Sequence, residues 1–252
     1  MQDILKRVRS GELDLDEAES ALKRRMLRVG DFGRLDLEKE ARTGIPEVII
    51  AEGKELVQTR ELLIGLFEAS GFAMVTRLDP EEADELSGSV PLSYFPEARI
   101  GVAGRKDPVN GVVGILTAGT SDIPVAEEVR VVIESLGCRT ITAYDVGVAG
   151  IHRVTSALEG MVGDVGVIVV AAGREGALAS VVAGLVDVPV IGVPVSTGYG
   201  AGGSGESALL SMLQSCSPLL TVNIDAGVIA GMMAFKIARL AGDDALDDGV
   251  ST

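Results

Sequence analysis

Val112-Val113-Gly114-Ile115-Leu116 is the stretch that decides the fold, and it runs directly into the small and polar residues Thr117-Ala118-Gly119-Thr120-Ser121-Asp122. An uninterrupted apolar run of this kind is typical of a strand buried on both faces of a parallel sheet. Pro124 follows, and proline is favoured in the first turn of a helix. The segment therefore predicts a strand, a glycine-containing loop and a helix.

The same order recurs to the end of the chain, with further strands predicted at 140–144, 166–171, 188–193 and 220–224. Helices are predicted between them at 152–161, after residue 176 and at 206–214, and a last one at 227–240. Strict alternation of buried strands and helices predicts an α/β protein with an open, doubly wound parallel sheet in a three-layer sandwich of the flavodoxin or Rossmann type.

The first hundred residues have a different, more charged composition. They hold one small strand–helix–strand unit, predicted at 47–51, 54–70 and 72–76. We therefore expect an accessory α/β domain over residues 1–95, the sheet domain over 96–242, and a disordered acidic tail over 243–252.

Charge and composition exclude several classes of protein. The chain of 252 residues has 22 Lys and Arg against 37 Asp and Glu, a net charge of −15, which disfavours nucleic-acid and anionic membrane partners. No apolar run reaches the ~18 residues of a membrane span, and the charged N-terminus does not resemble a signal peptide. The two cysteines form no CxxC pattern, so a disulfide framework or zinc site is not expected. We expect a cytoplasmic protein.

Ligands of such sheets bind beyond the carboxyl ends of the strands. Four strand ends carry loops that mix glycine with polar residues, at 117–122, 145–153, 172–176 and 196–205. Glycine allows close backbone approach and helix N-termini attract anions, so the pattern predicts a phosphorylated ligand. There is no Walker motif. The long loop 196–205 is interpreted as a mobile flap, with a solvent-exposed linker as the alternative.

The sequence leaves more than one role open for several individual residues. Asp122 can cap a helix, bind a ligand, or do both. His152, the only histidine, is structural or belongs to the crevice with Arg153. Glu175, between glycines with Arg174, is a candidate site carboxylate, because burying a charge unpaired is costly. Cys138 is expected to fill the core, and Cys216 is either an inert buried thiol or a nucleophile.

Several segments resemble carboxyaminoimidazole ribonucleotide mutase, the purine-pathway carboxylase, in the same order and with similar spacing. They are Gly119-Thr120-Ser121-Asp122 with Pro124-Val125, Ile151-His152-Arg153, Ala171-Ala172-Gly173 and 189–195. The sequence is still more similar to a related family, the pyridinium-3,5-biscarboxylic acid mononucleotide synthases (LarB) of nickel-pincer cofactor assembly. The segments that carry this similarity are 31–33, 42–48, 144–153, 175–178, 184–189, 215–216 and 222–225.

The resemblance implies a PurE-like catalytic domain that carboxylates the pyridinium ring of nicotinic acid adenine dinucleotide with CO2 or bicarbonate. Hydrolysis of the phosphoanhydride would release AMP. By the same resemblance Cys216 forms a transient covalent adduct with the ring. Glu175 and Asp145 are the expected catalytic carboxylates, with Glu175 the expected base; exchange of their two roles is the alternative, because both follow strands at the same crevice. The residues expected to bind substrate are Gly119, Thr120, Ser121, Asp122, His152, Arg153, Gly173, Arg174, Gly176, Ser196, Gly198 and Tyr199.

No tightly bound cofactor or metal is expected, although Mg²⁺ can accompany the substrate phosphates. The resemblance also implies a homo-oligomer, an octamer, and the apolar helix at 227–240 agrees with burial between subunits or under the sheet. Two alternatives stay open. One is the purine mutase itself, although that enzyme has a histidine in its third glycine-containing loop, whereas residues 174–178 at that place in this chain contain none. The other is a non-enzymatic nucleotide sensor.

Overall fold

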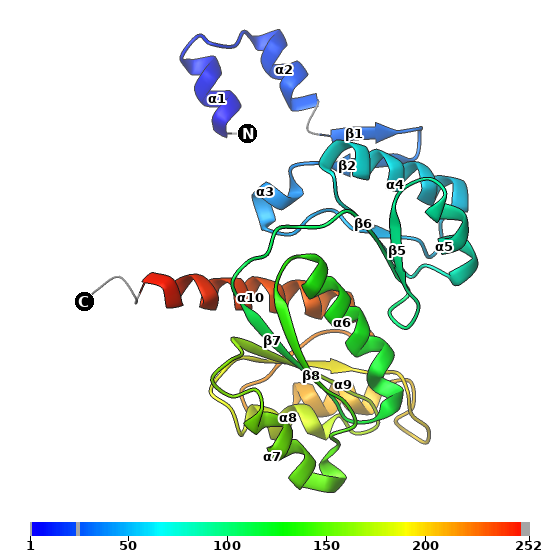
Figure 1. Cartoon of the computed structure of the whole chain (residues 1–252), viewed down its shortest axis with the longest axis vertical. Coiled ribbons are helices and arrows are strands. Elements are labelled where there is room, and N and C mark those ends of the chain that lie inside the picture. The colour runs from blue at the N-terminus through cyan, green and yellow to red at the C-terminus, as the bar shows by residue number, and fades with distance from the viewer. Residues whose placement is uncertain (1, 24–25, 248–252) are drawn as a thin grey trace. The chain divides into compact units, whose positions relative to one another are not determined.

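The computed structural model describes residues 2–23 and 26–247, which form two compact units (Figure 1). One unit contains the chain up to Tyr94 together with Ile100–Gly104. The other contains Phe95–Arg99 and the chain from Arg105 onward. Each unit has a sheet of its own.

The second unit contains the predicted parallel sheet. Its strands lie in the order β11-β10-β9-β7-β8, and every neighbouring pair is parallel. The central strands β7, β9 and β10 are buried along their whole length, as their apolar sequences predict. The bounds are β7 Val112–Thr117, β8 Arg139–Ala143, β9 Val167–Ala172, β10 Val190–Pro194 and β11 Leu220–Thr221.

Helices cover both faces of this sheet, which confirms the doubly wound, three-layer architecture. α6 (Ile123–Ser135) and α10 (Gly227–Asp247) lie side by side on one face (Figure 1). The other face is covered by α7 (Ile151–Glu159), α8 (Ala177–Ala183) and α9 (Glu206–Leu213). The side chains of these three helices pack with those of the strands in one aliphatic core.

α10 is longer than the helix predicted at 227–240. It continues to Asp247, so residues 243–247 of the predicted disordered tail are helical. Alanine and leucine are strong helix formers, and both recur in this last stretch, at Ala245 and Leu246. The rest of the predicted tail lies outside the described residues.

The first unit contains the predicted strand–helix–strand motif within a larger sheet of order β3-β4-β6-β5. β3 and β4 are parallel and are joined by α4, as predicted, whereas β6 adds to β4 in the antiparallel direction. The bounds are β3 Ile49–Ile50, α4 Leu56–Ser70, β4 Ala73–Thr76, α5 Pro80–Ser87, β5 Leu92–Phe95 and β6 Ile100–Ala103. The unit also contains α1 Gln2–Arg9, α2 Leu15–Lys23, the hairpin of β1 Met26–Val29 and β2 Gly33–Asp36, and α3 Lys39–Thr43.

β6 lies beyond the domain boundary predicted at residue 95. It nevertheless pairs with β4, with Ala103 opposite Ala73, and its Ile100 and Ala103 are fully buried. The first unit thus extends to Gly104, because its sheet takes in a strand from beyond that boundary. Over the described chain, no helix combines the length and apolar character required to cross a bilayer.

Candidate active site

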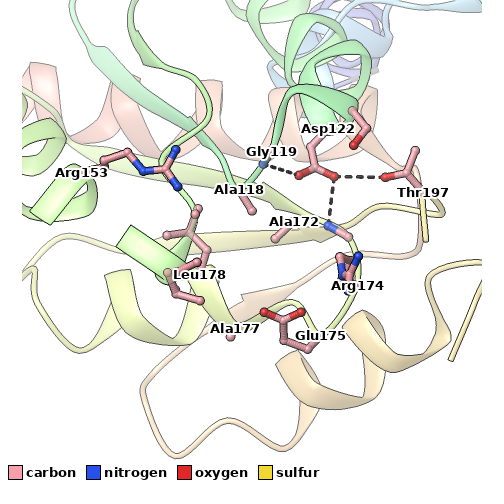
Figure 2. Close-up of a pocket in the computed structure, with 15 residues that line it drawn as sticks. Ala118, Gly119, Asp122, Arg153, Ala172, Arg174, Glu175, Ala177, Leu178 and Thr197 are labelled. Carbon is pink, nitrogen blue, oxygen red and sulfur yellow. Dashed lines mark hydrogen bonds between the residues drawn. The ribbon is translucent and has the colours of Figure 1, made fainter. Parts of the chain in front are cut away.

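A cavity of about 520 Å³ lies at the carboxyl ends of β7 and β9 in the second unit. Both strands adjoin the point where the strand order reverses, which is where ligands of doubly wound sheets bind. The polar and charged side chains that line the cavity come from three loops and α7 (Figure 2). They are Ser121, Asp122, Arg153, Arg174, Glu175 and Thr197, and the other lining residues are Ala118, Gly119, Gly147, Val148, Ala149, Ala172, Gly173, Ala177 and Leu178.

Asp122 connects three of the strand-end loops (Figure 2). Its Oδ2 accepts a hydrogen bond from the backbone N–H of Gly119 at 2.8 Å. Its Oδ1 accepts bonds from the N–H of Gly173 at 3.1 Å and from Oγ1 of Thr197 at 3.2 Å. Asp122 occupies the N-cap position of α6, yet its side chain makes no capping bond to that helix. Its carboxylate therefore holds the loops after β7, β9 and β10 together.

The Asp122 carboxylate is almost completely buried, with 4% of the residue exposed. Burial raises its pKa above the ordinary value of 3.8, although the hydrogen bonds from Gly119, Gly173 and Thr197 act in the opposite direction. A charge removed from water gains its stability from such donors. Its oxygens are directed to the protein rather than to the cavity, so Asp122 shapes the site.

Arg153 is held in place by Asp145. The Nη1 of Arg153 donates to the backbone oxygen of Asp145 at 2.7 Å and to its carboxylate Oδ2 at 3.1 Å. Asp145 has a left-handed backbone with a φ of 57°, and its N–H donates to Oγ1 of Thr117 at the end of β7. Strained conformations of this kind persist where the surrounding structure stabilises them, often at functional sites. Asp145 lies beside the cavity and orients the arginine that lines it.

Arg174 and Glu175 follow β9 directly, and both are exposed. The reasoning that unpaired burial would be costly therefore does not apply to them, because the loop carries both side chains out of the core. Arg174 has a φ of 48°, and its guanidinium lies 4.7 Å from the ring centre of Tyr199. Its Nη1 also donates to the Tyr199 hydroxyl at 3.1 Å. Arg174 thus joins the β9 loop to the loop at 196–205.

Two glycines allow the loops to approach one another. A Cβ on Gly173 would lie 2.5 Å from the backbone oxygen of Thr197, and one on Gly147 would lie 2.6 Å from that of Ala118. Both distances are too short for any side chain, so the crevice needs glycine at these positions.

The remaining predicted substrate-binding residues lie around the cavity without lining it. The backbone N–H of Ser196 donates to Oδ1 of Asp225 at 2.9 Å, which attaches the start of the 196–205 loop. Gly176, with a φ of 64°, is the N-cap of α8. The mobility of the 196–205 loop stays a prediction. Thr120, His152 and Gly198 are exposed.

Cys216 lies apart from every other predicted site residue. It precedes β11, whose Leu220 is opposite Ile191 in the first half of the parallel strand β10. Cys216 is therefore at the amino edge of the sheet, whereas the cavity is at the carboxyl edge. Its neighbour Ser217 lies at the C-terminal end of α8, next to Gly184. The thiol is exposed, which excludes the inert buried reading, whereas Cys138 is buried as predicted.

Sequence reasoning missed two residues that hold the site together. Thr197 lines the cavity, and its hydroxyl donates a hydrogen bond to Asp122. Asp225, which has a φ of 53°, accepts a hydrogen bond from the backbone of Ser196 and so anchors the loop that contains Thr197. The signal for Asp225 was available, because it follows the last strand at the same edge as the other loops. Thr197 had no distinguishing signal among the small residues of its loop.

Among the residues that the structure describes, no three His, Cys, Asp or Glu side chains are arranged so that they could hold a metal ion. The charged groups that can meet a ligand in the cavity are two guanidinium groups and one exposed carboxylate. The two guanidinium groups can bind an anionic ligand, and the carboxylate can accept a proton from that ligand.

Comparisons with known proteins identify the family of the chain. Residues 27–105 match the LarB/PurE-like N-terminal domain, and residues 112–250 match the AIR carboxylase domain. An uncharacterized protein from Methanocaldococcus jannaschii is 41% identical over 254 residues, covering 95% of this chain and 97% of that protein. N5-carboxyaminoimidazole ribonucleotide mutase from Pyrococcus horikoshii is 31% identical over 133 residues, which are 50% of this chain and 71% of the mutase. The mutase from Thermotoga maritima is also 31% identical, over 132 residues that cover 50% of this chain and 73% of the mutase. The chain belongs to the LarB-like relatives of PurE, in which a LarB/PurE-like N-terminal domain is joined to an AIR carboxylase domain.

Proposed function

We propose that this protein carboxylates the pyridinium ring of nicotinic acid adenine dinucleotide and hydrolyses its phosphoanhydride. The products are AMP and pyridinium-3,5-biscarboxylic acid mononucleotide, an intermediate of nickel-pincer cofactor synthesis. The observation that carries the proposal is a single cavity that brings together Arg153, Arg174 and Glu175, in a chain that joins a LarB/PurE-like N-terminal domain to an AIR carboxylase domain.

The charges of the cavity suit this substrate. The Arg153 and Arg174 guanidinium groups can bind phosphate oxygens, and the exposed Glu175 carboxylate can face the positive ring. Any Mg²⁺ would be held by the substrate phosphates. In this proposal Glu175 is the base, and Asp145 positions Arg153 through the two bonds between them.

The carboxylation needs a nucleophile, because a pyridinium ring is too electron-poor to attack CO2. A thiolate adds to C4 and forms an S–C bond, which converts the ring to a dihydropyridine with an electron-rich C5. C5 then attacks CO2, Glu175 accepts the proton from C5, and the S–C bond breaks to return the thiolate. One C–H bond has become one C–COO⁻ bond with release of a proton. Thiolate suits these steps because it is both a good nucleophile and a good leaving group.

Mass spectrometry after incubation with nicotinic acid adenine dinucleotide, bicarbonate and Mg²⁺ tests the proposal. AMP and the dicarboxylated mononucleotide should form with the wild type and not with Cys216→Ala or Glu175→Gln. Asp187→Ala, an exposed carboxylate away from the cavity, is the control and should retain activity.

The second candidate is the purine mutase reaction, which the identity to three such mutases over half of the chain favours. That reaction needs no thiol. Turnover of N5-carboxyaminoimidazole ribonucleotide by both the wild type and Cys216→Ala, with no product from the dinucleotide, would replace the first proposal with this one. Binding of the dinucleotide without turnover of either substrate would indicate a sensor.

A further inference from the structure

Tyr144 lies between the end of β8 and the strained residue Asp145. β8 is an edge strand that pairs only with β7 among the described strands, and the last pair of this ladder is Leu116 with Ala143. The chain beyond Ala143 therefore depends on other contacts for its direction. Asp145 adopts a left-handed φ of 57°, a conformation that persists where neighbouring contacts hold it. One such contact is the bond from its N–H to Thr117, and the Tyr144 side chain supplies a second.

The Tyr144 hydroxyl is bonded to a carboxylate on α6. It donates a hydrogen bond of 2.5 Å to Oε1 of Glu127, whose side chain is only 13% exposed. Arg130 holds Glu127 in turn, because it donates from Nε to Oε1 at 2.9 Å and from Nη2 to Oε2 at 2.6 Å. Arg130 also donates to Glu134 at 2.7 Å. The acceptor of the tyrosine bond is thus fixed on a helix that packs against α10 and the sheet.

The protonation of the two partners favours this bond. The hydrogen bond from Arg130 lowers the pKa of Glu127 by more than partial burial raises it, so Glu127 is ionised at neutral pH. Burial and the Glu127 carboxylate raise the pKa of Tyr144, so the phenol keeps its proton and donates it to the bond. A hydrogen bond to an ionised acceptor is stronger than one between neutral groups.

Asp145 connects this anchored segment to the cavity. Its backbone oxygen and its Oδ2 accept hydrogen bonds from Nη1 of Arg153, at 2.7 and 3.1 Å, and Arg153 lines the cavity (Figure 2). A rotation of the backbone at Asp145 would move both acceptors together, since they belong to one residue. The place of the guanidinium therefore depends on a backbone that Tyr144 and Thr117 anchor from two sides.

We infer that Tyr144 is a positioning residue for substrate binding: its bond to Glu127 fixes Asp145 and, through Asp145, the Arg153 guanidinium that binds a phosphate group. The inference rests on the proposed function, because that function supplies a substrate with two phosphate groups. Tyr144 does not line the cavity, so it acts through Asp145. Hydrogen bonds weaken steeply when their distance or angle departs from the optimum, so loss of the Tyr144 hydroxyl should raise KM and leave kcat nearly unchanged.

Tyr144→Phe tests the inference, because it removes only the hydroxyl and leaves Glu127 bonded to Arg130. KM for nicotinic acid adenine dinucleotide should rise about 3–10-fold, with kcat within about twofold of wild type. Tyr94→Phe is the matched control, since it removes a hydroxyl that donates to the backbone oxygen of Leu78 at 2.9 Å in the first unit. Its KM should equal that of wild type. An unchanged KM for Tyr144→Phe, or the same increase for Tyr94→Phe, would overturn the inference.

A double-mutant cycle tests whether the effect passes through Arg153. In the Arg153→Ala background the guanidinium is absent, so the addition of Tyr144→Phe should change KM by less than about twofold. Glu127→Ala should raise KM as Tyr144→Phe does, whereas Glu127→Gln, whose amide oxygen still accepts from the phenol, should raise it less. A full increase from Tyr144→Phe in the Arg153→Ala background would show that Tyr144 acts by another route and would overturn the inference.

Hydrogen exchange needs no turnover, so it separates failure of this inference from failure of the proposed function. The N–H groups of Asp145 and Val146 donate to Thr117, each at 2.9 Å. Without ligand, both amides should exchange about 3–10-fold faster in Tyr144→Phe than in wild type, and at the wild-type rate in Tyr94→Phe. Faster exchange in a protein that does not turn over the dinucleotide would refute the proposed function and still support the link from Tyr144 to Asp145. Equal rates in wild type and Tyr144→Phe would overturn the inference whatever the activity.

Discussion

Replacing Asp122 tests whether one buried carboxylate holds the active-site loops in place. Asp122→Ala removes an acceptor for the N–H groups of Gly119 and Gly173 and for the Thr197 hydroxyl. Asp122→Asn keeps one oxygen, which can accept from one of these N–H groups. Its amide nitrogen then faces the other donor and leaves it without a partner.

The expected magnitudes follow from these bonds. A buried donor left without a partner costs about 1–3 kcal/mol, and the Thr197 hydroxyl can rotate toward water. Two unsatisfied N–H groups, partly offset because the buried charge is removed, give a loss of about 2–4 kcal/mol in the free energy of unfolding for Asp122→Ala. Asp122→Asn should lose about half as much, since it leaves one donor unsatisfied.

Urea denaturation of both variants at one protein concentration measures these losses, with exposed Asp187→Ala as a control that should stay within about 0.5 kcal/mol of wild type. Hydrogen exchange should also become faster at Gly119 and Gly173 in Asp122→Ala. A loss below about 1 kcal/mol for Asp122→Ala, or equal losses for the alanine and asparagine variants, would refute this account of the bonds.

Three further outcomes follow from the same geometry. Burial raises the pKa of Asp122 in the folded state, so the free energy of unfolding of the wild type relative to that of Asp122→Asn should be highest below pH 3.8, the ordinary pKa of an aspartate. This difference should fall as the pH rises through the raised pKa. A difference in unfolding free energy that rises with pH in urea titrations would contradict this. Arg153→Ala should raise KM for the dinucleotide by about 10–100-fold through the loss of a charge-assisted bond, and Arg153→Lys should recover part of it; steady-state kinetics with KM unchanged would show that Arg153 does not bind substrate. The chain contains no tryptophan, so Tyr199→Trp is a single reporter beside Arg174, and its emission should change when the dinucleotide binds but not in a Tyr199→Trp/Arg174→Gln double variant; identical responses of both proteins would exclude an Arg174-dependent change.

The parallel sheet was predictable because its central strands are unbroken apolar runs between glycine-rich loops. β2, with Arg34 and Asp36 among its four residues, has no such signal. β6 has an apolar sequence, but it is short, and it lies between β5, which directly precedes it in the chain, and β4, which is distant in the chain. Only tertiary structure determines that it completes the first sheet.

The candidate site was predictable where residues follow a strand. Arg153, Arg174 and Glu175 meet at one cavity because parallel strands end at the same edge. The same rule, applied to Cys216, gives the opposite result: it precedes β11, so chain direction alone places it at the other edge. The link from Asp122 to Thr197 was not predictable, because it joins two loops that are 75 residues apart, and no local sequence pattern encodes their contact.

The path of the chain through β6 has a consequence for dissecting the protein into parts. A truncated protein that begins at residue 96 would retain Ile100–Ala103 without β4, leaving an apolar strand with two open edges and a tendency to aggregate. One that begins at residue 105 would remove that strand with its sheet. A failure of the shorter deletion would therefore report an orphaned strand rather than a catalytic need for the N-terminal domain, and only the longer deletion can measure whether that domain acts in turnover.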